Sequence, residues 1–96
     1  MVDKNATTET AALFYNLYKN AGSKILVGHQ DAFYSYYQND ASMSDVKKTT
    51  GSDPAMIGLD FMFITDKNYQ ANSSNWYYQQ EQKIIAAAKE AYNKGM

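Results

Sequence analysis

Two short apolar runs, roughly thirty residues apart, constrain what this chain can fold into. The first covers residues 24–28 and the second residues 55–61, and both are almost unbroken series of apolar side chains. Continuous rather than alternating apolar residues are typical of strands buried on both faces of a parallel sheet. Their spacing is the size of one strand–helix–strand unit. The runs therefore predict two parallel strands with a helix between them.

A helix is predicted before the first strand. Residues 8–21 carry apolar side chains at spacings of three and four, with Glu9 near the start and Gly22 just after the end. Such spacing forms one apolar stripe, and glycine is the usual residue where a helix stops. Residues 1–7 are polar and are expected to be disordered, so the folded region is predicted to cover residues 8–96.

Two further helices are predicted, one between the strands and one after them. A short helix is expected over residues 44–50, with Ser42 or Ser44 as its N-cap. A long helix is expected from a cap at residues 74–75 to about Asn93. The buried stripe of the long helix is predicted to contain Tyr77, Ile84, Ile85, Ala88 and Tyr92, with Gln80 and Glu81 on or beside it.

Two strands alone do not make a closed parallel sheet. Each edge of such a sheet presents unpaired backbone groups, and apolar parallel strands need helices on both faces. The order helix, strand, short helix, strand, long helix is therefore typical of the first part of a larger α/β fold. The remainder of that fold, or another chain, would complete the sheet. A compact α+β domain is the alternative.

Composition excludes several classes of function. Nine basic and ten acidic side chains, with no basic block, argue against nucleic acid as a partner. The absence of cysteine excludes a disulfide framework and a thiolate nucleophile. The longest apolar run is far too short to cross a bilayer, and the first residues lack the pattern of a signal peptide. Nine tyrosines suit sugar rings or protein partners, and composition does not choose between these.

Polar residues follow the first strand at once, at the end where α/β scaffolds collect their active sites. His29 is the only histidine, and Gln30 and Asp31 come next. Asp60 holds the corresponding place near the end of the second strand. Residues 32–43 then form a long loop rich in tyrosine. An ordinary polar loop is the alternative to a functional site here.

Three motifs in this order resemble glycoside hydrolase family 26. Ile25–Asp31 looks like the first barrel strand of that family. Ser44–Gly51, beginning Ser-Asp-Val and ending Thr-Gly, resembles the short helix that follows, and Asp53–Asp60, with Pro-Ala and Gly-Leu-Asp, resembles the second strand. The resemblance covers about residues 8–94. Leu59 departs from the pattern, because many members have an aromatic residue there, and this leaves the exact specificity open.

The resemblance implies a fold, an activity and a location. The fold is a (β/α)₈ barrel of roughly 250 residues or more, of which this chain would be the N-terminal part: the leading helix and the first two βα units. The activity is retaining hydrolysis of β-1,4-mannan without a cofactor, in a secreted or cell-surface protein. The two catalytic glutamates of the family lie on strands four and seven, so this chain alone is expected to be inactive.

The expected contribution of the chain is a wall of the sugar-binding cleft, with β-mannan or a manno-oligosaccharide as the partner. The expected substrate-binding residues are His29, Gln30, Asp31, Tyr34, Tyr37 and Asp60. Because Gln30 and Asp31 are adjacent on a strand, only one of them is expected to face the sugar.

Several alternatives remain for these residues. His29 is equally consistent with a buried structural histidine, and Asp60 with a cap of the next loop. Asp31 and Asp60 could instead form a carboxylate pair, or bind a metal together with His29, although one histidine and no cysteine argue against zinc. The alternative function is a small non-catalytic α/β domain whose tyrosines contact a carbohydrate or a protein.

Overall fold

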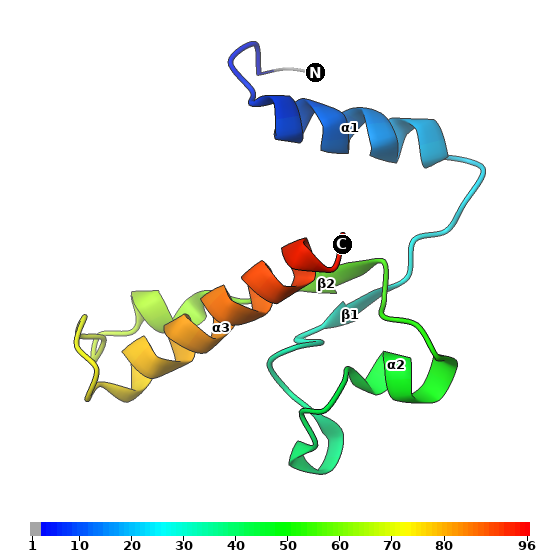
Figure 1. Cartoon of the computed structure of the whole chain (residues 1–96). Helices are drawn as coiled ribbons and strands as arrows, with labels where there is room; N and C mark the ends of the chain where they lie inside the picture. The colour runs from blue at the N-terminus through cyan, green and yellow to red at the C-terminus, as the bar shows by residue number, and fades with distance from the viewer. Residues whose placement is uncertain (1–2) are drawn as a thin grey trace.

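The computed structural model describes residues 3–96 and shows a small α/β unit with two parallel strands (Figure 1). Its helices and strands are α1 (Thr8–Asn20), β1 (Gly28–Gln30), α2 (Asp45–Thr50), β2 (Met56–Gly58) and α3 (Trp76–Asn93), with 3₁₀ turns at Tyr37–Asn39 and Met62–Thr65. This order matches the order predicted from the sequence. Among the described residues, no helix has the length and apolar character needed to cross a membrane.

Residues 1–7 were predicted to be disordered, and the structure describes residues 3–7 of this segment. Met1 and Val2 lie outside the described residues. The backbone N–H of Asn5 donates to Asp3 Oδ1 over 2.8 Å, and Thr7 caps α1 by accepting a hydrogen bond from the Thr10 N–H. The disorder of this segment and the boundary of the folded region at residue 8 stay predictions.

The sheet consists of β1 and β2 in parallel. Gly28 pairs with Met56, His29 with Ile57, and Gln30 with Gly58. One hydrogen bond continues the pairing at each end: Ala55 N–H donates to the Val27 carbonyl over 2.9 Å, and Asp31 N–H to the Gly58 carbonyl over 2.8 Å. The predicted parallel pair is confirmed, and its register brings the carboxyl ends of both strands to one edge.

The predicted bounds of the strands were wrong. The first strand covers residues 28–30 rather than 24–28, and the apolar run before it is not buried: Ile25 is 92% exposed and Val27 63% exposed. The physical reason is that β2 pairs only with the polar end of the run, and no helix or strand within residues 3–96 covers the side chains that precede it. A continuous apolar run thus indicates which side chains are suited to burial. It does not indicate which residues form hydrogen bonds with the neighbouring strand.

The second strand is also shorter than predicted, covering residues 56–58 rather than 55–61. The sequence left open whether residues 61–65 extend this strand or turn away from it. They turn away, because Met62–Thr65 form a 3₁₀ turn that the Asp60 carboxylate caps.

The C-terminal half of helix α3 lies beside the sheet, and the helix supplies most of the core (Figure 1). Asn75 is its N-cap, accepting a hydrogen bond from the Tyr78 N–H over 3.1 Å. The buried residues of α3 are Gln80, Ile84, Ala87 and Ala91. Ala87 and Ala91 pack with Phe33 of the loop after β1.

The predicted buried stripe of α3 is correct at Ile84 and wrong at Tyr92. Tyr92 is 74% exposed, whereas its neighbour Ala91 is buried. Ala87 and Ala91 pack against Phe33, and Tyr92, which follows Ala91 by about 100° around the helix, therefore points off the buried face. Tyr77, Ile85 and Ala88 are half-buried.

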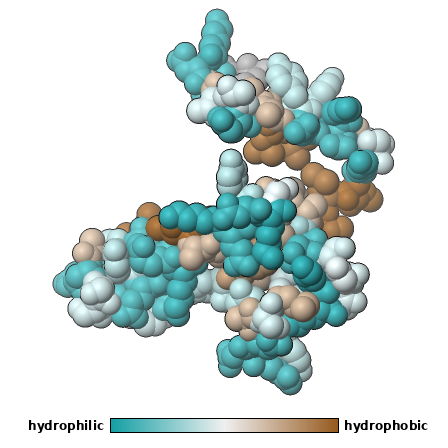
Figure 2. All heavy atoms as spheres, in the orientation of Figure 1, coloured by the Kyte–Doolittle hydropathy of each residue, from teal (hydrophilic) through white to brown (hydrophobic). Residues whose placement is uncertain are grey.

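Helix α1 lies apart from the rest of the unit, and none of its residues is buried (Figure 1). The predicted apolar stripe exists, but it is uncovered: Leu13 is 59% exposed and Leu17 44% exposed. In Figure 2, apolar side chains gather on the face of α1 that is turned toward the remainder of the molecule. The stripe therefore faces the sheet and α3 across open space.

Ser44 anchors α2 to the rest of the structure. This fully buried serine, rather than Ser42, is the N-cap: its Oγ accepts a hydrogen bond from the Lys47 N–H and donates one to Asp53 Oδ1 over 2.7 Å. The Asp53 carboxylate also lies 3.7 Å from the ammonium groups of both Lys47 and Lys94. The hydrogen bond from Ser44, assisted by the two lysine charges, lowers the pKa of Asp53.

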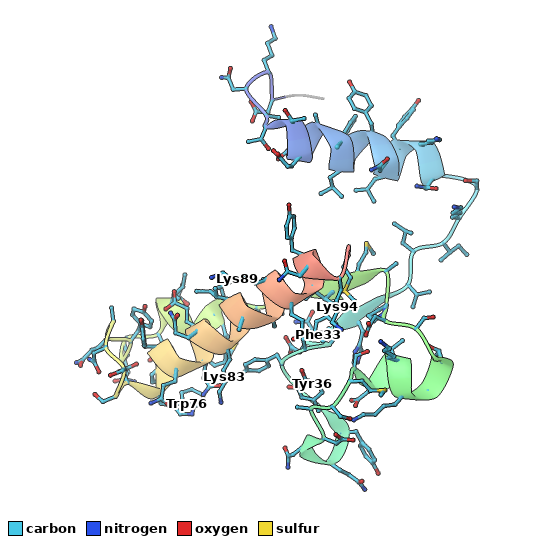
Figure 3. The ribbon with its side chains drawn as sticks, viewed as in Figure 1. Phe33, Tyr36, Trp76, Lys83, Lys89 and Lys94 are labelled. Carbon is cyan, nitrogen blue, oxygen red and sulfur yellow. The ribbon has the colours of Figure 1, made fainter. Side chains whose placement is uncertain are left out.

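Lys94 extends this network to the core. Its ammonium group lies 5.3 Å from the centre of the Phe33 ring, in the range of a cation–π interaction, and Figure 3 shows the two side chains together below the end of α3. Asp53 and Lys94 thus connect α2, the end of α3 and the loop after β1.

Replacing Ser44 by alanine is expected to lower the free energy of unfolding by about 2 kcal/mol. The change removes a helix cap and leaves a half-buried carboxylate oxygen without its donor. Urea unfolding measures this cost. Ser35→Ala, in an exposed loop, is the control and should change stability by less than about 0.5 kcal/mol. Equal costs for the two variants would contradict the role of Ser44.

The same pair of variants also tests how the stability of the fold depends on pH. Because the pKa of Asp53 is lowered by folding, its contribution is present above the ordinary pKa of aspartate and is lost as the pH falls toward the lowered pKa. The acid-dependent loss of stability should therefore be smaller in Ser44→Ala than in the wild type, and unchanged in Ser35→Ala.

Candidate functional site

His29 lies in the middle of β1 and is half-buried. Its ring nitrogen Nδ1 is buried and has no hydrogen-bond partner among residues 3–96. Buried polar atoms in native proteins almost always have a partner, so this nitrogen is available to a group outside the described contacts. The binding role and the structural role that the sequence left open for His29 both stay predictions.

Gln30 and Asp31 come together instead of pointing apart. Gln30 Nε2 donates a hydrogen bond to Asp31 Oδ1 over 3.3 Å. The expectation that the two side chains lie on opposite sides of a strand was wrong, because Asp31 has a φ of 56° and has left the extended conformation in which side chains alternate. Aspartate is one of the few residues that adopt this left-handed conformation readily.

A tight turn after β1 brings Tyr34 next to Asp31. The Asp31 carbonyl accepts hydrogen bonds from the N–H groups of Tyr34 (3.0 Å) and Ser35 (2.9 Å). The Tyr34 hydroxyl then donates to Gln80 Oε1 of α3 over 2.6 Å. Burial, and secondarily the negative charge of Asp31, raise the pKa of Tyr34. Gln30, Asp31 and Tyr34 thus form one polar group at the carboxyl end of β1, which Gln80 ties to α3.

Sequence reasoning placed Gln80 on or beside a buried stripe but gave it no role. The available signal was a polar residue at a position that the helical period turns inward, since a buried amide needs a hydrogen-bond partner. The tyrosine-rich loop after the first strand is a source of such partners. The sequence alone does not specify which tyrosine reaches the helix.

Tyr37 and Asp60 do not join this group through any hydrogen bond between described residues. The Tyr37 backbone N–H donates to both carboxylate oxygens of Asp45, and its side chain is 72% exposed. Asp60 Oδ1 accepts a hydrogen bond from the Met62 N–H over 2.9 Å, so Asp60 acts as a cap of the next turn, one of the two roles that the sequence left open. Tyr36, half-buried beside α2, has a pKa raised by burial and by the charges of Glu90 and Asp45 (Figure 3).

Within residues 3–96, no three histidine, cysteine, aspartate or glutamate side chains lie together in a way that could hold a metal ion, so His29, Asp31 and Asp60 do not form such a group. The three glutamates lie on helices, Glu9 on α1 and both Glu81 and Glu90 on α3. Glu81 Oε2 accepts a hydrogen bond from the Tyr69 hydroxyl over 2.6 Å.

A separate apolar cleft of about 790 Å³ lies between α1 and the remainder of the unit. Its walls are mostly apolar and include Leu13 and Leu17 of α1, Leu26, Met56 and Ile57 near the sheet, and Ala88 and Tyr92 of α3. None of the six predicted substrate-binding residues lines it. The polar group at the end of β1 and the apolar cleft are therefore two distinct surfaces.

The structure of this chain is similar to a solved structure over its whole length. The structure of GH26C from Muricauda sp. MAR_2010_75 matches 100% of this chain with a TM-score of 0.93 and 50% sequence identity. The resemblance to glycoside hydrolase family 26 is confirmed. The chain covers 26% of that family 26 protein.

A curated sequence relative points to the same family. Over 58 residues, or 60% of this chain, the sequence is 41% identical to a mannan endo-1,4-β-mannosidase of Bifidobacterium adolescentis, and it covers 6% of that protein. No family model matches the chain. The chain thus spans a small part of each of these two relatives.

Tyr34→Phe is expected to lower the free energy of unfolding by about 2 kcal/mol, because it leaves the buried Gln80 amide oxygen without its donor. Tyr37→Phe is the matched control: the same hydroxyl is removed from a 72% exposed side chain, and the change should stay below about 0.5 kcal/mol. Chemical unfolding of both variants checks this. Equal losses of stability in the two variants would show that the hydrogen bond from Tyr34 to Gln80 does not stabilise the fold.

Proposed function

We propose that this chain is the N-terminal part of the (β/α)₈ barrel of a retaining glycoside hydrolase that cleaves β-1,4-mannan. The observation that carries the proposal is the match of the whole chain, at 50% identity, to about a quarter of a family 26 protein. The parallel pair with an uncovered apolar run supports a larger sheet. The name of the Bifidobacterium relative supports mannan as the substrate.

The proposed role of the chain is to form one wall of the sugar-binding cleft. Barrel enzymes bind substrates at the carboxyl ends of their strands, where β1 and β2 end side by side. Gln30, Asp31 and Tyr34 offer amide, carboxylate and hydroxyl groups to sugar hydroxyls there. Tyr37 adds an exposed ring of the kind that stacks on sugars. His29, in the middle of β1, and Asp60, two residues after β2, complete the proposed set.

The catalytic carboxyl groups would come from outside this chain. Retaining hydrolysis needs an acid/base and a nucleophile roughly 5 Å apart. All three glutamates of this chain lie on helices rather than at strand ends, and Glu81 is bound to Tyr69. The chain by itself is therefore proposed to be inactive.

The remainder of the barrel is the proposed partner of the uncovered surfaces. The free edge of β1, the exposed run at residues 25–27 and the apolar face of α1 all require a covering element, since each leaves apolar side chains or strand-edge groups in water. A polysaccharide substrate favours a secreted or cell-surface location for the whole protein.

Activity assays test this proposal. The purified chain should release no reducing sugar from β-1,4-mannan, whereas a longer protein that includes this sequence should release it. In the longer protein, His29→Ala should lower kcat/KM about tenfold, the effect of losing one hydrogen bond in binding. Lys89→Ala, at an exposed position of α3, is the control and should have no effect.

Two results would count against the proposal. Sugar release by the isolated chain would show that it holds its own catalytic carboxyl groups. Tight binding of manno-oligosaccharides by the isolated chain, with no cleavage by any longer protein, would favour a non-catalytic carbohydrate-binding domain instead.

A further inference from the structure

Gly58 faces Gln30 across the sheet, and the space above this glycine is filled by the Gln30 side chain. The two residues are partners in the parallel register. A methyl group at position 58 would overlap Gln30 Oε1 and would lie 3.1 Å from Gln30 Cδ. The carboxamide of Gln30 therefore lies over the end of β2, where only a glycine leaves room for it.

Space, rather than backbone conformation, is what a larger residue at position 58 would have to take from Gln30. Gly22, Gly51 and Gly95 have positive φ values, but Gly58 does not. An L-amino acid could therefore adopt its backbone conformation, and the obstacle to a larger residue is the Gln30 carboxamide. Gly28, at the other end of the same pairing, differs: a methyl group there would meet only atoms of Met56, at 3.6 to 3.7 Å.

The carboxamide connects Gly58 to Asp31. While Oε1 lies over Gly58, Nε2 of the same planar group donates to Asp31 Oδ1 over 3.3 Å. Gly58 also holds the Asp31 backbone, because its carbonyl accepts the Asp31 N–H over 2.8 Å. The Asp31 backbone is thus held by Gly58 of β2, and its side chain by Gln30 of β1.

The Asp31 carboxylate is well suited to receive a ligand. Within residues 3–96 it forms no ion pair, and its hydrogen bond from Gln30 involves one oxygen only. A carboxylate accepts up to four hydrogen bonds, so most of its capacity is free. Sugar hydroxyls are donors of the matching kind.

We infer that Gly58 and Gln30 are positioning residues, which orient the Asp31 carboxylate as an acceptor for a hydroxyl group of the bound sugar. The assignment of the ligand rests on the proposed function. The orientation of Asp31 by Gln30 and Gly58 does not depend on it.

A double-mutant cycle tests the inference. Gly58→Ala should displace the carboxamide, and Gln30→Ala should remove it, so each variant should change the ¹³Cγ resonance of Asp31 in NMR spectra of the chain. The double variant should resemble Gln30→Ala, because position 58 then has nothing left to displace. Gly28→Ala is the control and should leave the Asp31 resonance in place.

Sugar binding supplies the second measurement. In a longer protein that cleaves mannan, Gly58→Ala and Gln30→Ala should each raise KM for a manno-oligosaccharide about tenfold, with no further increase in the double variant. Gly28→Ala should keep the wild-type KM. Additive effects of the two variants would overturn the inference.

The spectra separate this inference from the proposed function. An Asp31 resonance that does not change in either Gly58→Ala or Gln30→Ala would overturn the positioning role, whatever the activity. If Gly58→Ala proves too disruptive to fold, Gln30→Ala changes an exposed side chain and decides the same question. Absence of mannan cleavage with a changed resonance would count against the proposed function and in favour of the positioning role.

Discussion

The parallel pairing of three residues in β1 with three in β2 is the constraint on which the rest of the structure depends. It places the carboxyl ends of both strands at one edge, and it sets Gly58 opposite Gln30. Beside this pair, Ala87 and Ala91 of helix α3 pack with Phe33, and Ile57 of β2 lies against them. The polar group around Asp31 then forms where the first strand ends and the chain turns toward α3.

Hydrogen bonds and ion pairs between side chains hold α2 and the end of α3 beside the two strands. Ser44 and Asp53 fix α2, and Lys94 brings the end of α3 to the same carboxylate and to the Phe33 ring. Helix α1 has no comparable anchor: its apolar face borders a cleft of about 790 Å³ instead of a packed core. Side-chain contacts therefore hold α2 and α3 against the sheet, whereas α1 is separated from it by the cleft. The family 26 protein that this chain matches is about four times as long.

Local features of the sequence predicted local structure well. The caps at Ser44 and Asn75 and the left-handed Gly51 act within one turn of chain, so the bounds of α2 and α3 followed closely from their residue types. The strand bounds did not, because the apolar run at residues 25–27 shows what must be buried in a complete fold and not which residues pair. The burial of Ala91 rather than Tyr92 depended on the packing of α3 against Phe33, which the helical period alone does not specify.

The residue types after β1 predicted a polar group there, but not how its side chains meet. The polar residues after β1 were identified from the sequence, yet the contact of Gln30 with Asp31 depends on a single left-handed residue, and the partnership of Tyr34 with Gln80 spans 46 positions of the chain. Asp60, in the corresponding place after β2, instead accepts a hydrogen bond from the next turn, and its binding role stays a prediction. Strand ends therefore indicate where a site lies, while the turn that follows decides which side chains meet there.

The proposed site is best tested by a crystal structure of a longer protein that contains this sequence, with a manno-oligosaccharide bound. We expect a third strand paired with the free edge of β1 and a sugar hydroxyl within hydrogen-bond distance of the Asp31 carboxylate. A β1 edge that stays unpaired, or a sugar bound in the apolar cleft beside α1, would contradict this expectation.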